Sequence, residues 1–191
     1  VRNTFMGGNL SYEKRNFSLG VTGVYNEIDA NFSPRISTYN QFSQLDNKNV
    51  NVGTDFSYLF RNLNFFGEVS HSVDGGYGHT IGALVVLDPR LSLGIQNRSF
   101  GKDFKPIQSN AIGESSTNTN EKGTFIGLEA KPSTHFTLSI FADRFAFKWL
   151  RFQTDAPSEG HRLLAQLNYK PSKRLETYFR YRKRQKGRNN A

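Results

Sequence analysis

The chain has 191 residues, 36% of them hydrophobic, with 17 Phe, 8 Tyr, 17 Gly and a mean hydropathy of −0.58. No stretch reaches the roughly 18 consecutive apolar residues of a membrane helix, and the absence of cysteine excludes disulfides and thiolate metal sites. The net charge is +9, and the basic residues are unevenly distributed: the segment from Arg174 to Arg188 contains seven basic residues and one acidic residue, Glu176. Such a cluster could meet nucleic acid or anionic lipid headgroups, but a solvated loop or lumen wall is favoured.

Polar and apolar residues alternate along ten successive segments, which predicts β-strands because neighbouring side chains of a strand point to opposite faces. In chain order the alternation is clearest at residues 6–13, 17–25, 50–60, 65–74, 81–87, 91–98, 126–130, 136–143, 163–169 and 175–182. Helical spacing of apolar residues is not sustained anywhere in the sequence. Strands of about 9–11 residues, rich in aromatics and glycine, are typical of membrane barrels, which face lipid on one side and a lumen on the other.

The connections between the predicted strands alternate in length. Short turns are expected at Lys14-Arg15, Arg61-Asn62, Asp88-Pro89-Arg90, 131–135 and 170–174. Longer segments fall at about 30–49, 101–122 and 149–160, with a tight exception at Gly75-Gly76-Tyr77. Because outer-membrane barrels have short periplasmic turns and longer external loops, we assign the short turns to the periplasmic rim.

Turn lengths provide an independent check, because residues that pair across a hairpin share a face. Four of the predicted turns pair two outward apolar residues: Phe60 with Leu63, Leu87 with Leu91, Ala130 with Phe136, and Tyr169 with Leu175. Each turn length therefore agrees with the alternation of its two strands.

Aromatic residues beside the short turns lie where an interfacial girdle is expected. They are Tyr12, Phe17, Tyr58, Phe60, Phe65, Phe136 and Tyr169. The alternative is that they are ordinary strand aromatics of a soluble sandwich. The histidines His71 and His79 are expected on the outer face near the external rim.

Charged residues on the opposite face of the strands are candidates for lining the lumen. They are Glu68, Arg98, Glu129, Asp143, Glu176, Arg180 and Arg182. Charges on the inner wall of a barrel either brace a packed interior through ion pairs or line a water-filled route. Bracing is favoured over a selective pore.

No catalytic, cofactor-binding or metal site is predicted. The sequence offers no set of a nucleophile, a histidine and an orienting group that is expected to converge, so the chain is not expected to be an enzyme. In the alternation from Tyr178 to Arg182, a strand puts Phe179 and Tyr181 on one face and both arginines on the other, so no nucleic acid is expected as a partner. Acidic residues of the long segments are scattered without the spacing of a calcium loop: Asp46, Asp103, Glu114, Glu121, Asp155 and Glu159.

Several short strings occur in the order found in a known family. They are Asn64-Phe65-Phe66-Gly67-Glu68, Leu87-Asp88-Pro89-Arg90, Gly113-Glu114-Ser115-Ser116, Asn120-Glu121-Lys122-Gly123, Trp149-Leu150-Arg151, Asp155-Ala156-Pro157-Ser158 and Tyr178-Phe179-Arg180-Tyr181-Arg182. From about Val50 onward the chain resembles the C-terminal barrel region of large Bacteroidota proteins described as helix-hairpin-helix domain-containing. The resemblance implies a fold and an outer-membrane location. It transfers no DNA-binding role, because no Gly-rich hairpin between two helices is found here.

The sequence thus predicts an all-β, antiparallel up-and-down transmembrane β-barrel, with residues 1–191 forming one barrel segment of about ten strands. Residue Val1 follows no signal segment, as expected of a mature protein or an excised piece. Both ends are expected to point to the external side, which implies further strands at each end and a barrel of 12 or more strands.

The leading functional hypothesis is an anchor or scaffold of a larger envelope protein in the outer membrane of a Gram-negative bacterium, able to include a transport path. The expected partners are outer-membrane lipid, lipopolysaccharide and other envelope proteins. The alternatives are an open porin-like uptake channel and a soluble β-sandwich binding module, whose outward apolar faces a second sheet would have to bury.

Overall fold

The computed structural model describes residues 2–29, 36–42, 47–106 and 109–189, and these form a single antiparallel sheet. Its strands pair in chain order, each with the next, as the sequence predicts. They are β1 (Arg2–Lys14), β2 (Phe17–Asp29), β3 (Lys48–Phe60), β4 (Leu63–Ser72), β5 (Tyr77–Asp88), β6 (Leu91–Phe100), β7 (Glu121–Ser133), β8 (Phe136–Phe147), β9 (Ser158–Ser172) and β10 (Leu175–Lys186). No helix long and apolar enough to cross a membrane occurs in this described part of the chain.

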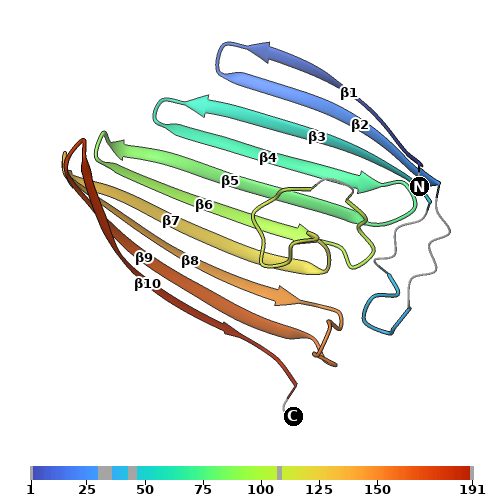
Figure 1. Cartoon of the computed structure of the whole chain (residues 1–191). Coiled ribbons are helices and arrows are strands. Elements are labelled where there is room, and N and C mark those ends of the chain that lie inside the picture. Colours follow the sequence, from blue (N-terminus) through green and yellow to red (C-terminus); the bar gives the residue numbers. More distant parts are fainter. Residues whose placement is uncertain (1, 30–35, 43–46, 107–108, 190–191) are drawn as a thin grey trace.

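The sheet is curved, with short turns at one end and long connections at the other (Figure 1). Strand β1 begins and β10 ends at the end that carries the long connections. The short turns extend the hydrogen-bonded ladder, because the last turn residue accepts a backbone hydrogen bond from a later strand. Asn16 O accepts from Leu59 N at 2.8 Å, and Asn62 O accepts from Val86 N at 2.9 Å.

Two of the predicted turns differ slightly from the structure. The first turn consists of Arg15 and Asn16, one residue later than expected. Near the third turn a β-bulge makes Leu91 pair with Asp88 instead of Leu87. The register farther from this turn is the predicted one, since Val85 pairs with Leu93.

The prediction of two five-residue turns is wrong. Ser133 pairs with Phe136 and Ser172 pairs with Leu175, so each turn has two residues, and Ala130 and Tyr169 pair with Leu138 and Thr177. The reason is a bulge in each hairpin at Pro132 and Pro171, since proline has no N–H to donate to the ladder. The shift is two residues, so every side chain keeps its predicted face.

The two faces of the sheet differ in how far their side chains are buried. We call the face on which the β6–β7 connection packs the inner face, and the opposite face the outer face. Along β8 from Ala142 to Phe147 the inner residues Asp143, Phe145 and Phe147 are buried, whereas the outer residues are exposed or half-buried. Large apolar residues on the outer face remain exposed, among them Val69, Ile81, Ile95, Ile126 and Ile140.

Replacement of Gly82 by alanine should destabilise the sheet. A Cβ at Gly82 would lie 2.5 Å from Phe66 Cζ and 2.8 Å from Ile95 O, so the inner face must shift at a cost of about 1–3 kcal/mol. Gly8→Ala is the matched control, because a Cβ there meets nothing within 4 Å. Urea unfolding followed by the fluorescence of Trp149, the single tryptophan, measures both variants. Equal midpoints would contradict this packing.

Candidate functional site: the inner face and its loop

A buried ion-pair cluster centred on Arg98 ties three neighbouring strands together on the inner face. Arg98 Nε donates to Glu121 Oε1 at 2.6 Å, and its two terminal nitrogens donate to the Asp143 carboxylate at 2.8 and 3.1 Å. The three side chains come from β6, β7 and β8 and are at most 2% exposed. The planar guanidinium suits this two-pronged contact, which a lysine could not reproduce.

Gly123 provides the space in which the guanidinium lies. It pairs with Arg98 across β6 and β7, and a Cβ there would lie 2.4 Å from Arg98 Cζ. Any larger residue would displace the arginine from its two carboxylates. The glycine therefore serves close approach, as glycine within a strand often does.

Glu121 also holds the β6–β7 loop, described here over residues 101–106 and 109–120. Its carboxylate accepts hydrogen bonds from Glu114 N at 2.9 Å and from Ser115 N at 2.7 Å. Asn118, 2% exposed, donates through Nδ2 to Ala111 O at 3.1 Å. The end of the loop is thereby fixed to the charged cluster.

The start of the same loop is fixed to β3 and β4. Lys105 N donates to Ser72 Oγ at 3.0 Å, and Asn51 Nδ2 donates to Lys105 O at 3.2 Å. The Phe104 ring stacks on Phe100 with centroids 6.3 Å apart and covers Gly78. Although the sequence predicted a long external loop, this one folds back across the inner face (Figure 1).

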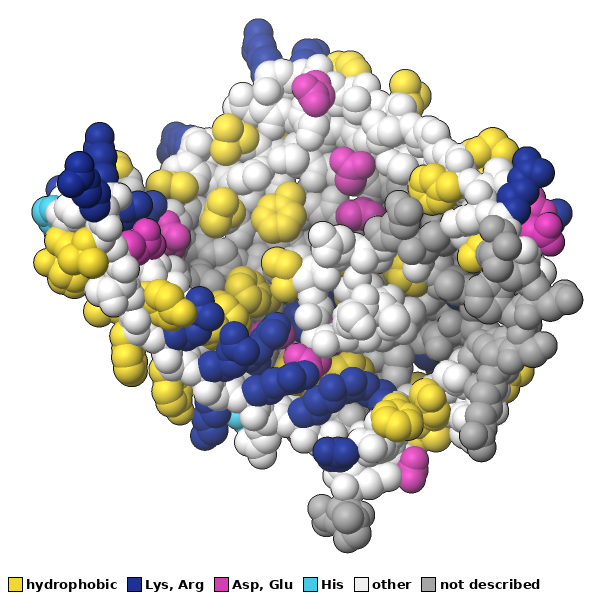
Figure 2. All heavy atoms as spheres, viewed as in Figure 1, with side chains coloured by type: hydrophobic (Ala, Val, Ile, Leu, Met, Phe, Trp, Pro, Cys, Tyr) yellow, Lys and Arg dark blue, Asp and Glu magenta, His cyan; other side chains and the backbone are white. Residues whose placement is uncertain are grey.

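Basic residues gather at the β9–β10 side of the inner face. Glu114 forms ion pairs with Arg184 and with Lys186, the latter at 3.5 Å. Arg162 reaches Asp143 at 3.4 Å, and Arg151 lies 3.7 Å from the centroid of Phe147. Burial lowers the pKa of Arg151, although Glu114 and Glu121 oppose that shift. Figure 2 shows Lys and Arg side chains following one another across this part of the surface.

A groove of about 670 Å³ lies between the loop and strands β1 to β6. Its lining is mixed, with Phe5, Phe66 and Ile112 beside Asn51, Glu68 and Gln96. Acidic residues lie on this side of the sheet, where Asp55 pairs with Glu68 across β3 and β4. Basic residues predominate on the β10 side, so the inner face is electrically polarised from one edge towards the other.

The predicted lumen-lining residues fall into two groups. Arg98 and Asp143 meet in the buried cluster, and Glu68 lines the groove. The others lie nearer the short turns or the β10 edge of the sheet. Glu129 forms an ion pair with Lys131 at 2.9 Å, and Glu176 forms one with Lys170 at 3.4 Å. Arg180 donates a hydrogen bond to Gln166, and Arg182 is exposed.

Sequence reasoning missed the role of Glu121, which it placed among scattered loop acids. The available signal was the continued alternation of Glu121, Gly123 and Phe125, which extends β7 towards the long connection. Of the other acidic residues named there, Glu114 forms ion pairs with Arg184 and Lys186, and Asp46 lies outside the described residues.

The predicted girdle residues lie on the outer face beside the short turns. Phe17 pairs with Tyr58, and Tyr58 pairs with Phe65, which makes an aromatic row across three strands. The Phe136 and Tyr169 rings stack with centroids 4.6 Å apart. At the end of the sheet opposite the short turns, the His71 ring stacks on the Tyr77 ring, with centroids 4.1 Å apart. In the described part of the chain no three His, Asp or Glu side chains converge as metal ligands.

No protein-family model matches the sequence, and no curated protein matches it significantly. The resemblance to helix-hairpin-helix domain-containing proteins therefore stays a prediction.

Loss of Arg98 should both destabilise the sheet and release the loop. Arg98→Leu leaves two buried carboxylates short of a cation, at a cost of about 3–5 kcal/mol. The matched control is Arg144→Leu, which breaks only the exposed pair with Glu159 and should hardly change the unfolding midpoint. Urea unfolding and trypsin cleavage after Lys102 report the two effects. If both variants behaved alike, the cluster would not hold the loop.

Proposed function

We propose that this chain forms part of the wall of a β-barrel in the outer membrane of a Gram-negative bacterium and serves as the anchor or scaffold of an envelope protein. The observation that carries the proposal is the reversal of the two faces. Apolar rows on the outer face are exposed, whereas Arg98, Glu121 and Asp143 are buried on the inner face. A protein that folds in water does the opposite, and an apolar surface this extensive marks a contact with lipid or protein.

The arrangement of turns, aromatics and edges supports the same proposal. Short turns gather at one end beside the aromatic row, as at the periplasmic rim of a barrel. Within the described residues β1 and β10 each pair on one side only. Long unpaired edges favour aggregation, so we propose that further strands complete a barrel of 12 or more.

The braced interior favours a scaffold. The Arg98 cluster and the β6–β7 loop take up space that a wide channel would leave to water. In this proposal the outer face contacts lipid and lipopolysaccharide, and the long connections are available to other envelope proteins. A soluble sandwich is disfavoured because no second sheet covers the outer face in the described residues.

Adjacent substitutions on β6 test which face meets hydrocarbon. Ile95 is 49% exposed on the outer face, and Gln96 lines the groove on the inner face. In lipid vesicles Ile95→Lys should cost about 2–4 kcal/mol, because the charge enters the bilayer, and Gln96→Lys should cost much less. Urea unfolding in phosphatidylcholine vesicles measures both.

The wild-type chain should need detergent and should migrate faster unheated than boiled in denaturing gels. A chain that stays soluble and monomeric without detergent would contradict the proposal.

A second candidate function is a porin-like uptake channel, which the groove and the polarised inner face favour. Arg182 lies on the inner face of β10, and the next residue, Lys183, lies on the outer face. In planar bilayers a channel should prefer anions, and Arg182→Glu should lower that preference, whereas Lys183→Glu should not. Absence of conductance in the full-length protein would leave the scaffold.

A further inference from the structure

On the outer face, basic side chains follow the apolar rows at the end of the strands that carries the long connections. Towards the long connections, the outer positions of β7 pass from Ile126 through Thr124 to Lys122. On β8 they pass from Ala142 to Arg144, and the same alternation reaches Lys148 just beyond the strand. Of this set Arg144 already has an acidic partner, Glu159 at 3.1 Å.

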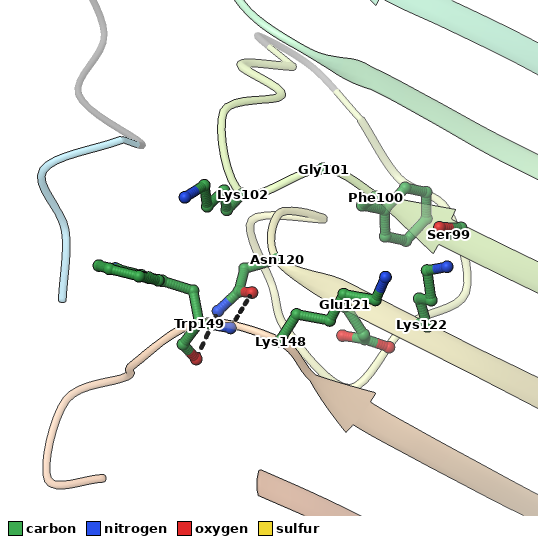
Figure 3. Close-up of a pocket in the computed structure, with 9 residues that line it drawn as sticks. All are labelled: Ser99, Phe100, Gly101, Lys102, Asn120, Glu121, Lys122, Lys148 and Trp149. Atoms are coloured by element: carbon green, nitrogen blue, oxygen red, sulfur yellow. Dashed lines mark hydrogen bonds between the residues drawn. The ribbon is translucent and has the colours of Figure 1, made fainter. Parts of the chain in front are cut away.

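Lys122 and Lys148 are adjacent and face one shallow pocket. Lys122 pairs with Ala146 across β7 and β8, two residues before Lys148. Both line a pocket of about 350 Å³ that Ser99, Lys102 and Trp149 also border (Figure 3). Both side chains are cationic, so two such neighbours are unfavourable without a counter-charge between them.

Other polar side chains that line this pocket already have partners elsewhere. They leave the two ammonium groups without a counter-charge. Asn120 holds the backbone of Trp149 through hydrogen bonds of 2.8 and 3.0 Å. The Glu121 carboxylate is engaged by Arg98 and by loop amides, and Lys102 lies over the Trp149 ring at 4.4 Å. Among the residues that the structure describes, no carboxylate pairs with Lys122 or Lys148.

From this arrangement we infer that Lys122 and Lys148 bind the phosphate groups of a membrane lipid. Two neighbouring cations match a phosphate, which brings negative charge and several acceptor oxygens. Lys122 lies on the outer face directly beyond the apolar rows, and Lys148 follows the same alternation just beyond β8. In the proposed barrel this is the level of lipid headgroups and not of a solute in the lumen. This inference rests on the proposed function, under which the long connections are external. The outer leaflet there carries lipid A, whose two phosphates make it the ligand.

Native mass spectrometry of the detergent-solubilised full chain tests the inference. The probes are bisphosphorylated lipid A and the same lipid without phosphates. Lys122→Gln/Lys148→Gln should weaken binding of the phosphorylated lipid about ten- to thirtyfold and leave the dephosphorylated lipid unaffected. The matched control, Lys14→Gln/Lys173→Gln, removes the same charge at the short-turn end and should bind as wild type does.

Three results would overturn the inference. They are equal affinity of the wild type for both lipids, an equal loss in the control variant, and displacement of the lipid by inorganic phosphate at the same concentration. The gel shift of the unheated protein is read on each sample. A shifted protein without lipid preference refutes only the lipid site, whereas loss of the shift in the wild type refutes the membrane barrel itself.

Discussion

Alternation of side chains along ten paired strands, interrupted at bulges beside the short turns, is the constraint on which the rest of this structure depends. It separates two environments across a single layer: the outer face carries apolar rows, and the inner face carries the buried charges together with aromatic residues such as Phe145 and Phe147. Because β6, β7 and β8 pair without a register shift around Arg98, Glu121 and Asp143, these three residues lie side by side on the same face. The same rule carries Lys122 to the outer face, one residue away from Glu121.

The β6–β7 loop links the charged cluster to the rest of the inner face. One part of it bonds to Glu121, and another part bonds to Ser72 and Asn51 on distant strands. The loop and the cluster therefore stabilise each other, and together they set how much of the inner space is filled. The scaffold and channel hypotheses differ only in how much of the inner space is filled, since both need the same outer surface.

The sequence alone predicts the ten strands, their order and the face of nearly every residue, because a period of two is a local signal. It also predicts that Arg98 and Asp143 share the inner face. It misses the bulges at Pro132 and Pro171, because a shift of two residues leaves the alternation unchanged. The inward course of the loop is missed as well, since contacts such as Asn51 with Lys105 join residues far apart in the chain.

Accessibility of single spin labels along β8 tests most directly whether the outer rows contact hydrocarbon. The chain contains no cysteine, so cysteines at 138, 139, 140 and 141 can be introduced one at a time and labelled in lipid vesicles. Labels at 138 and 140 should be open to oxygen, which dissolves in lipid, and closed to a water-soluble nickel complex. Labels at 139 and 141 should show less access to oxygen. Uniform access of the nickel complex to 138 and 140 would contradict the account.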